Sequence, residues 1–154
     1  LIPRLVERAG NDSRSGGAIT AVMTVLADGD DTIADPVVDT ARGVLDGHIV
    51  LDRAIAARGR YPAIDLAHSL SRTMDACVPP HHAAAAMAFR RALALAEANQ
   101  DLVAMGAHVR GADPAVDQAL DRRAEMEAFL QQARDECADF AETTAALLSG
   151  WGAA

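Results

Sequence analysis

The sequence contains no lysine, and all 14 of its Lys and Arg residues are arginine. A Walker A loop places a lysine on the β- and γ-phosphates of a nucleotide, so this sequence cannot contain that loop. Schiff-base chemistry, which requires a lysine amine, is excluded for the same reason. Any phosphate binding by this chain therefore depends on arginine side chains or on backbone N–H groups.

Aromatic residues and positive charge are also scarce. Aromatic residues make up 3% of the sequence, the formal net charge is −8 and the pI is about 4.9. Proteins that bind nucleic acids need a basic face, and those that bind single strands also use aromatic rings on which bases stack. The composition therefore argues against a nucleic-acid partner.

Cysteines are few, and no long hydrophobic run is present. Cys77 and Cys137 form neither a disulfide framework nor a metal-binding spacing, which predicts reduced thiols in a cytoplasmic protein. His81 and His82 are adjacent and would point in different directions on a helix, so we expect no metal site. No apolar run approaches the roughly 20 residues that a membrane-spanning helix requires.

The first half of the sequence alternates predicted strands with helices. Apolar runs at residues 18–27 and 48–53 predict two short strands, and residues 61–72 predict a loop followed by a third short strand. A helix is expected to begin at Pro36 with Asp35 as its N-cap. Strands that are apolar on both faces and alternate with helices predict a parallel α/β layer. Three strands are too few for a complete open sheet, and the sequence starts without Met inside a predicted helix. We therefore expect a fragment that holds the end of a larger domain.

The second half predicts helices only. Alanine-rich or amphipathic segments predict three helices, at residues 81–107, 115–132 and 133–148. Asp113 is the expected N-cap of the second helix, followed by a proline at its first position. The predicted fold is α/β plus α: residues 1–79 form an incomplete α/β domain, and residues 80–154 form a helical bundle.

Two side chains near the last predicted strand are candidates for ligand binding. Arg72 ends that strand between small hydroxyl residues, and Tyr61, the only tyrosine, precedes a proline in a turn. The carboxyl ends of parallel strands face the ligand side of an open sheet, where a guanidinium group can bind phosphate oxygens with two parallel hydrogen bonds. The alternative is a surface arginine paired with Asp65 or Asp75.

Several consecutive motifs resemble one known family. The stretches GGAITAVMTVLADGDD, DGHIVLDR and YPAIDLAHSLSR follow one another in this order and at this spacing in the hexameric ATPase family of rotary ATP synthases. The acidic loop within the first stretch makes the sequence most similar to the flagellar and type III secretion export branch. The resemblance implies the C-terminal end of a RecA-like parallel-sheet nucleotide-binding domain, followed by a C-terminal helical domain.

The resemblance also implies roles for individual residues. Arg72 matches the arginine finger, which reaches the active site of the neighbouring subunit and stabilises charge on the γ-phosphoryl group. Tyr61 matches an aromatic residue that stacks on the adenine of its own subunit's nucleotide. Phe140 and Gln132, with Gln131 nearby, fall in a region that lies on the adenine side of the family's nucleotide site. No residue of this chain matches a metal ligand.

The implied activity is ATP hydrolysis that drives flagellar or type III protein export. The parent protein would use ATP and Mg²⁺. The Walker A loop, the catalytic glutamate and the magnesium-binding aspartate of the family all lie upstream of the residues present here. The chain alone is therefore expected to hold neither ligand and to be inactive.

The implied partners are neighbouring subunits of a homohexamer, export chaperones and substrates, and stalk and regulator proteins of the apparatus. Such a protein would lie in the cytoplasm at the cytoplasmic face of the inner membrane, attached only through the apparatus. Two alternatives remain open. One is a non-catalytic subunit of an ATP synthase-like ring that contributes only Arg72, and the other is a stand-alone helical interaction module.

Overall fold

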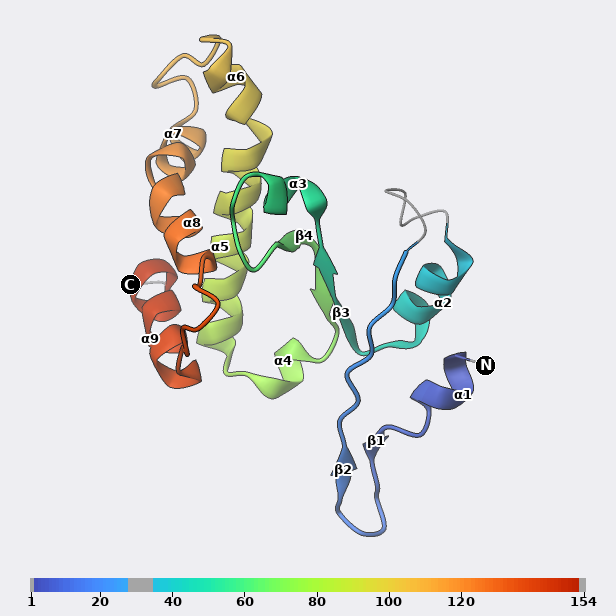
Figure 1. Ribbon diagram of the computed structural model, residues 1–154. Coiled ribbons are helices and arrows are strands. Elements are labelled where there is room, and N and C mark those ends of the chain that lie inside the picture. The colour runs from blue at the N-terminus through green and yellow to red at the C-terminus, as the bar shows by residue number, and fades with distance from the viewer. Residues whose placement is uncertain (1, 28–34, 153–154) are drawn as a thin grey trace. The chain divides into compact units, whose positions relative to one another are not determined.

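The computed structural model of the protein describes residues 2–27 and 35–152 (Figure 1). The chain divides into two units, Leu1–His48 and Ile49–Ala154. Residues 28–34, which include most of the acidic loop of the resemblance, lie outside the described residues. No helix within the described ranges is both long and apolar enough to cross a membrane.

The first unit combines short helices with a small hairpin. Its elements are α1 (Ile2–Val6), β1 (Gly10–Asn11), β2 (Ala18–Ile19) and α2 (Pro36–Val44). The two strands pair antiparallel, with Gly10 opposite Ile19. Helix α2 begins at Pro36 as predicted, because the Asp35 side chain accepts the N–H groups of the next two free amides, at Val37 and Val38. Helix α2 also contacts α1.

The predicted strand at residues 18–27 is wrong over most of its length. Only Ala18–Ile19 is in a strand, and residues 20–27 have no regular structure. Val22 is 94% exposed and Leu26 is 89% exposed. An apolar strand buried on both faces needs neighbouring strands and helices to cover it. Among the described residues, 20–27 pair with no other strand, so the run lacks the strand partners that its apolar pattern requires.

A second pair of strands leads to the candidate residues. Strand β3 (Gly47–Leu51) is followed by α3 (Arg53–Ala57), strand β4 (Ile64–Ser71) and α4 (Met74–Cys77), and β3 pairs with β4. Asp52, just after β3, donates its N–H to the carbonyl of Ala63, just before β4 (2.9 Å). The end of β3 therefore meets the start of β4, and the strands run in opposite directions (Figure 1). The parallel pairing predicted for these segments is not seen within the described residues.

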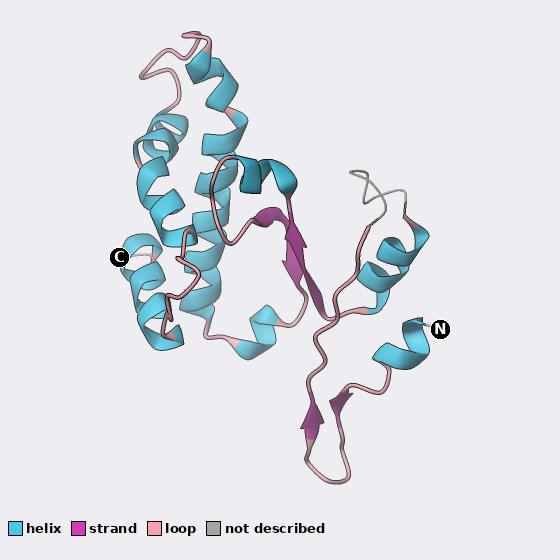
Figure 2. Cartoon of the chain, in the orientation of Figure 1, coloured by secondary structure: helices cyan, strands magenta, loops and turns pink. Residues whose placement is uncertain are grey.

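The helical region is built around α5. Its helices are α5 (Pro80–Ala98), α6 (Gln100–Ala104), α7 (Pro114–Asp121), α8 (Arg123–Leu130) and α9 (Phe140–Trp151) (Figure 2). Helix α5 contacts α7, α8 and α9. The buried cluster consists of side chains from α5, α7 and α8: Phe89, Leu93, Ala96, Ala119 and Met126. The hydrophobic core of the described residues therefore lies mainly between the helices.

The helix boundaries differ from the prediction in three places. The predicted helix at 115–132 is two helices, α7 and α8, which are separated at Arg122 and end at Leu130. In the other two places, side chains compete for backbone groups. The segment 81–107 is not one helix, since the Asn99 side-chain amide donates to the Leu95 carbonyl (2.8 Å) at the end of α5. The segment 133–148 becomes helical only at Phe140, because Asp139 accepts the N–H groups of the first turn of α9. Residues 131–139 are consequently a loop, and this loop forms one wall of the candidate site.

Candidate functional site

The turn before β4 presents Tyr61. The Tyr61–Pro62 peptide bond is cis, and Gly59 has a φ of 79°, a conformation that glycine adopts without steric cost. The Arg60 guanidinium donates to the carbonyl of Ile64 across the turn (3.1 Å). The Tyr61 side chain is 57% exposed, so its ring is available to a ligand.

The loop between α8 and α9 is hydrogen-bonded to this turn. The backbone N–H of Gln132 donates to the carbonyl of Tyr61 (2.9 Å). The Gln132 side-chain amide donates to the carbonyl of Glu136 (2.8 Å), and the Glu136 carboxylate accepts the N–H of Ala133 (2.9 Å). These bonds fold residues 131–136 back on themselves and hold them beside Tyr61.

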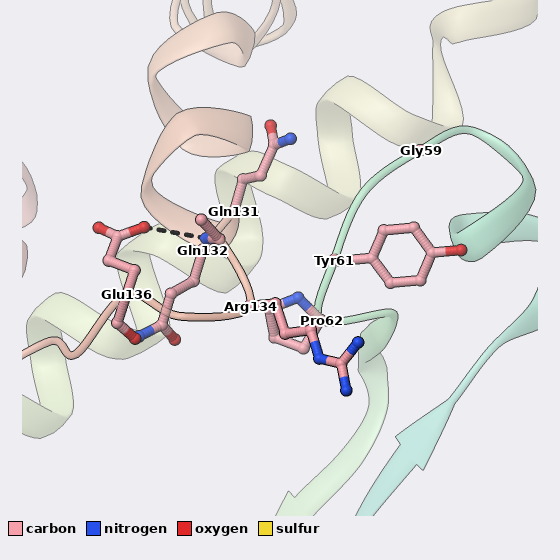
Figure 3. Close-up of a pocket in the computed structure, with 8 residues that line it drawn as sticks. Gly59, Tyr61, Pro62, Gln131, Gln132, Arg134 and Glu136 are labelled. Atoms are coloured by element: carbon pink, nitrogen blue, oxygen red, sulfur yellow. Dashed lines mark hydrogen bonds between the residues drawn. The ribbon is translucent and has the colours of Figure 1, made fainter.

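Together the turn and the loop line an open cavity of about 630 Å³ (Figure 3). The lining residues are Gly59, Tyr61, Pro62, Gln131, Gln132, Ala133, Arg134 and Glu136. Figure 3 shows the Tyr61 ring projecting from the turn on the side away from Gln132 and Glu136. An exposed ring beside amide and charged groups can stack on a flat heterocycle and hydrogen-bond its edge. Whether a base occupies this cavity is therefore tested by substitution of Tyr61 below.

The structure brings two of the four predicted residues to this cavity. Tyr61 and Gln132 both line it, as does Gln131. Phe140 does not line it: this residue is the first of α9 and its side chain is 77% exposed. Arg72 is also exposed and follows β4 directly, but is not among the lining residues. The roles of all four residues toward a nucleotide stay predictions.

Sequence reasoning missed the charged residues of the cavity wall. Arg134 and Glu136 were placed in a predicted helix at 133–148, whereas both lie in the loop. The Asp139-Phe140 step, in which an N-cap residue precedes the first helical residue, is the signal that would have moved the start of the helix.

The strand that leads to Arg72 is held by polar side chains. Asp65 Oδ1 accepts the N–H groups of Ala67 (2.8 Å) and His68 (3.1 Å), and Asp65 Oδ2 lies 2.6 Å from His68 Nδ1. Burial raises the pKa of Asp65, but the hydrogen bonds and charge of His68 outweigh it and hold that pKa below its usual value. The buried Ser69 side chain accepts the N–H of Val50 (2.9 Å). These contacts fix β4 just before the arginine.

The described residues offer no metal centre. Among residues 2–27 and 35–152, no three His, Cys, Asp or Glu side chains are grouped so that they could hold a metal ion. The sequence also lacks the lysine of a phosphate-binding loop. The cavity thus combines an exposed aromatic ring with amide and charged groups, and no metal-binding cluster is found among the described residues.

Comparison with known proteins matches two consecutive families to the chain. Residues 1–71 match the nucleotide-binding domain of the ATP synthase alpha/beta family. Residues 78–149 match the T3SS EscN ATPase C-terminal domain. The two matches follow one another and together span most of the sequence.

Individual relatives are similar over nearly the whole chain. The flagellum-specific ATP synthase of Salmonella typhimurium is 48% identical over 146 residues, which are 95% of this chain and 32% of the relative. The type 3 secretion system ATPase of Sinorhizobium fredii is 47% identical over 150 residues, which are 97% of this chain and 32% of the relative. The chain therefore spans about a third of the length of these relatives.

Solved structures show the same fold. The assembled ATPase EscN from the enteropathogenic E. coli type III secretion system matches with a TM-score of 0.90 and 36% identity, over 96% of this chain and 35% of that one. EscN in complex with its central stalk EscO matches with a TM-score of 0.84 and 34% identity, over 96% of this chain and 34% of that one. The arrangement of strands and helices described above is thus that of the C-terminal part of such ATPases.

Proposed function

The chain belongs to the flagellar and type III secretion branch of the ATP synthase alpha/beta family, and we propose that it is the C-terminal part of an ATPase that drives protein export. The observation that carries this proposal is that two family matches follow one another along the chain. Residues 1–71 match a nucleotide-binding domain, and residues 78–149 match an export-ATPase C-terminal domain. A non-catalytic subunit of an ATP synthase would not account for the second match.

In the proposed reaction, water attacks the γ-phosphorus of ATP and the bond to the β-phosphate oxygen breaks, which yields ADP and phosphate. Tyr61 stacks on the adenine bound by its own subunit, and Gln132 and Phe140 lie on the adenine side. Arg72 acts on the nucleotide of the neighbouring subunit, where its guanidinium group stabilises negative charge that develops on the transferred phosphoryl oxygens. Mg²⁺, when bound, would supply further charge stabilisation, and we assign no residue of this chain to it.

The proposed assembly is a homohexameric ring at the cytoplasmic face of the inner membrane. The solved structures of assembled EscN and of EscN with its central stalk support a ring with a stalk partner. Export chaperones, substrates and regulator proteins complete the proposed set of partners. We also propose a domain boundary between residues 79 and 80. Helix α5 begins there, at Pro80, and the second family match starts close by, at residue 78.

The first test compares the full-length protein with the chain of residues 1–154. We expect ATP hydrolysis by the full-length protein and none above background by the isolated chain, because the chain has no lysine for a phosphate-binding loop. Phosphate release at saturating ATP and Mg²⁺ measures both. Turnover by the purified chain, or its absence in the assembled full-length protein, would contradict the proposal.

The second test concerns Tyr61. In the full-length protein, Tyr61→Ala should raise KM for ATP by roughly 5- to 150-fold, since base–aromatic stacking contributes about 1–3 kcal/mol. Tyr61→Phe keeps the ring and should have a KM close to that of the unmodified protein. Phosphate release over a range of ATP concentrations gives both values. Equal KM values for the alanine and phenylalanine variants would show that the ring does not stack on the base.

A further inference from the structure

An arginine in the helical region is hydrogen-bonded to the backbone of β4, the strand that directly precedes Arg72. Arg90 lies on α5, which contacts β4 (Figure 1). Its Nη2 atom donates to the carbonyl of Leu66 (2.6 Å) and to the carbonyl of Ser69 (2.8 Å). Both bonds have a charged donor and are part-buried, so each is stronger than a bond between neutral groups on the surface.

Strand β4 depends on this support because it is not regular at this point. The Ser69 hydroxyl donates to the carbonyl of Asp65, four positions earlier. In a straight strand that rises about 3.3 Å per residue, positions four apart would be separated by ~13 Å, too far for this bond. The backbone between Asp65 and Ser69 is therefore bent. A bend interrupts the ladder of strand hydrogen bonds and leaves carbonyl groups to be satisfied by side chains. Arg90 satisfies two of them.

The part of α5 that carries Arg90 is anchored in the helical core. The preceding residue, Phe89, is 3% exposed and packs within the buried cluster of the helices. Arg91, the next residue of α5, is exposed. The two arginines therefore differ in environment although they are adjacent, and Arg91 is a matched control for Arg90.

We propose that Arg90 is a positioning residue for Arg72, through which α5 sets the place of the arginine at the end of β4. This inference rests on the proposed role of Arg72 in the neighbouring subunit's active site. The carbonyl that Arg90 fixes belongs to Ser69, only a few residues before Arg72. Electrostatic stabilisation of a transition state requires a preorganised donor, and a displacement of about 1 Å can lower a rate roughly 10²-fold. Releasing β4 from α5 would displace the guanidinium group in this way.

The test uses the full-length ATPase with Arg90→Met, which keeps the apolar stem and removes the donors. We expect kcat to fall roughly 10²-fold. KM for ATP should stay unchanged, because Tyr61 lies outside the segment from Leu66 to Ser69 that Arg90 holds. Arg90→Lys keeps an ammonium group able to donate to both carbonyls, and should recover most of the lost kcat. Arg91→Met should leave kcat unaltered. A rise in KM with unchanged kcat, or an equal loss from Arg91→Met, would overturn the proposal.

A double-mutant cycle separates positioning from a general structural role. If Arg90 acts through Arg72, adding Arg90→Met to Arg72→Ala should lower kcat no further. If Arg90 only maintains the fold, the two losses should multiply, and the proposal is overturned. If Arg72→Ala alone leaves kcat intact, the proposed role of Arg72 fails first and this inference fails with it. A loss from Arg72→Ala without any loss from Arg90→Met overturns the inference alone.

Discussion

Replacing Arg72 with alanine in the full-length protein should lower kcat for ATP hydrolysis by about 10³- to 10⁵-fold, the range found for arginine fingers in phosphoryl transfer. Arg72 is exposed at the end of β4 and does not line the cavity that contains Tyr61. This separation supports action on a nucleotide bound by another subunit. KM for ATP should change little, because the base is held by other residues. Phosphate release at saturating ATP measures the loss.

Two further variants sharpen this expectation. Arg72→Lys keeps the charge but loses the planar fork, so it should also be strongly impaired. Mixed rings test action in trans: subunits with Arg72→Ala are combined with subunits inactivated in their own nucleotide-binding loop. Such rings contain interfaces where an intact arginine meets an intact site, and should be more active than either pure ring. Mixed rings no more active than the pure ones would contradict action in trans.

The largest expected effect on stability is that of Phe89→Ala. Phe89 is 3% exposed, and its ring lies 5.3 Å from the ring of Phe129 and 5.2 Å from that of Trp151, measured between centroids. Removing it leaves a cavity at the centre of the helical core and deprives both neighbouring rings of their partner. The free energy of unfolding should fall by about 3–5 kcal/mol. Urea denaturation followed by circular dichroism measures the change.

Met87→Ala is the matched control for this prediction. Met87 lies on the same helix but is 60% exposed, so its truncation removes little buried surface. The free energy of unfolding should change by no more than about 0.5 kcal/mol. If the two variants unfold at the same urea concentration, Phe89 does not anchor the helical core.

Local signals in the sequence predicted the starts of two helices. Helices α2 and α7 begin where an aspartate precedes a proline, and in both the aspartate accepts backbone N–H groups of the first turn. Hydrophobic pattern was less reliable for strands. The run at residues 18–27 is as apolar as a buried strand, but only Ala18–Ile19 is paired. A strand forms only beside partners, which a local pattern does not specify.

The candidate site was only partly predictable for the same reason. Tyr61 and Arg72 belong to motifs near one strand, and their proposed roles follow from the resemblance of those motifs to the ATPase family. The loop at 131–139 was predicted as helix, so the positions of Arg134 and Glu136 beside the cavity were not foreseen. Arg90 had no distinguishing feature in the sequence, since an arginine follows it directly.

By itself, the sequence determined the helix starts, the absence of a phosphate-binding lysine and the motifs that indicate an export ATPase. Only the tertiary structure decided that Gln132 lies beside Tyr61 and that Arg90 reaches the carbonyl of Ser69. N-caps and motifs act through neighbours a few residues away, and such neighbours can be read along the chain. Contacts between distant segments depend on how the core around Phe89 packs α5 against the elements beside it, and no local periodicity encodes that packing.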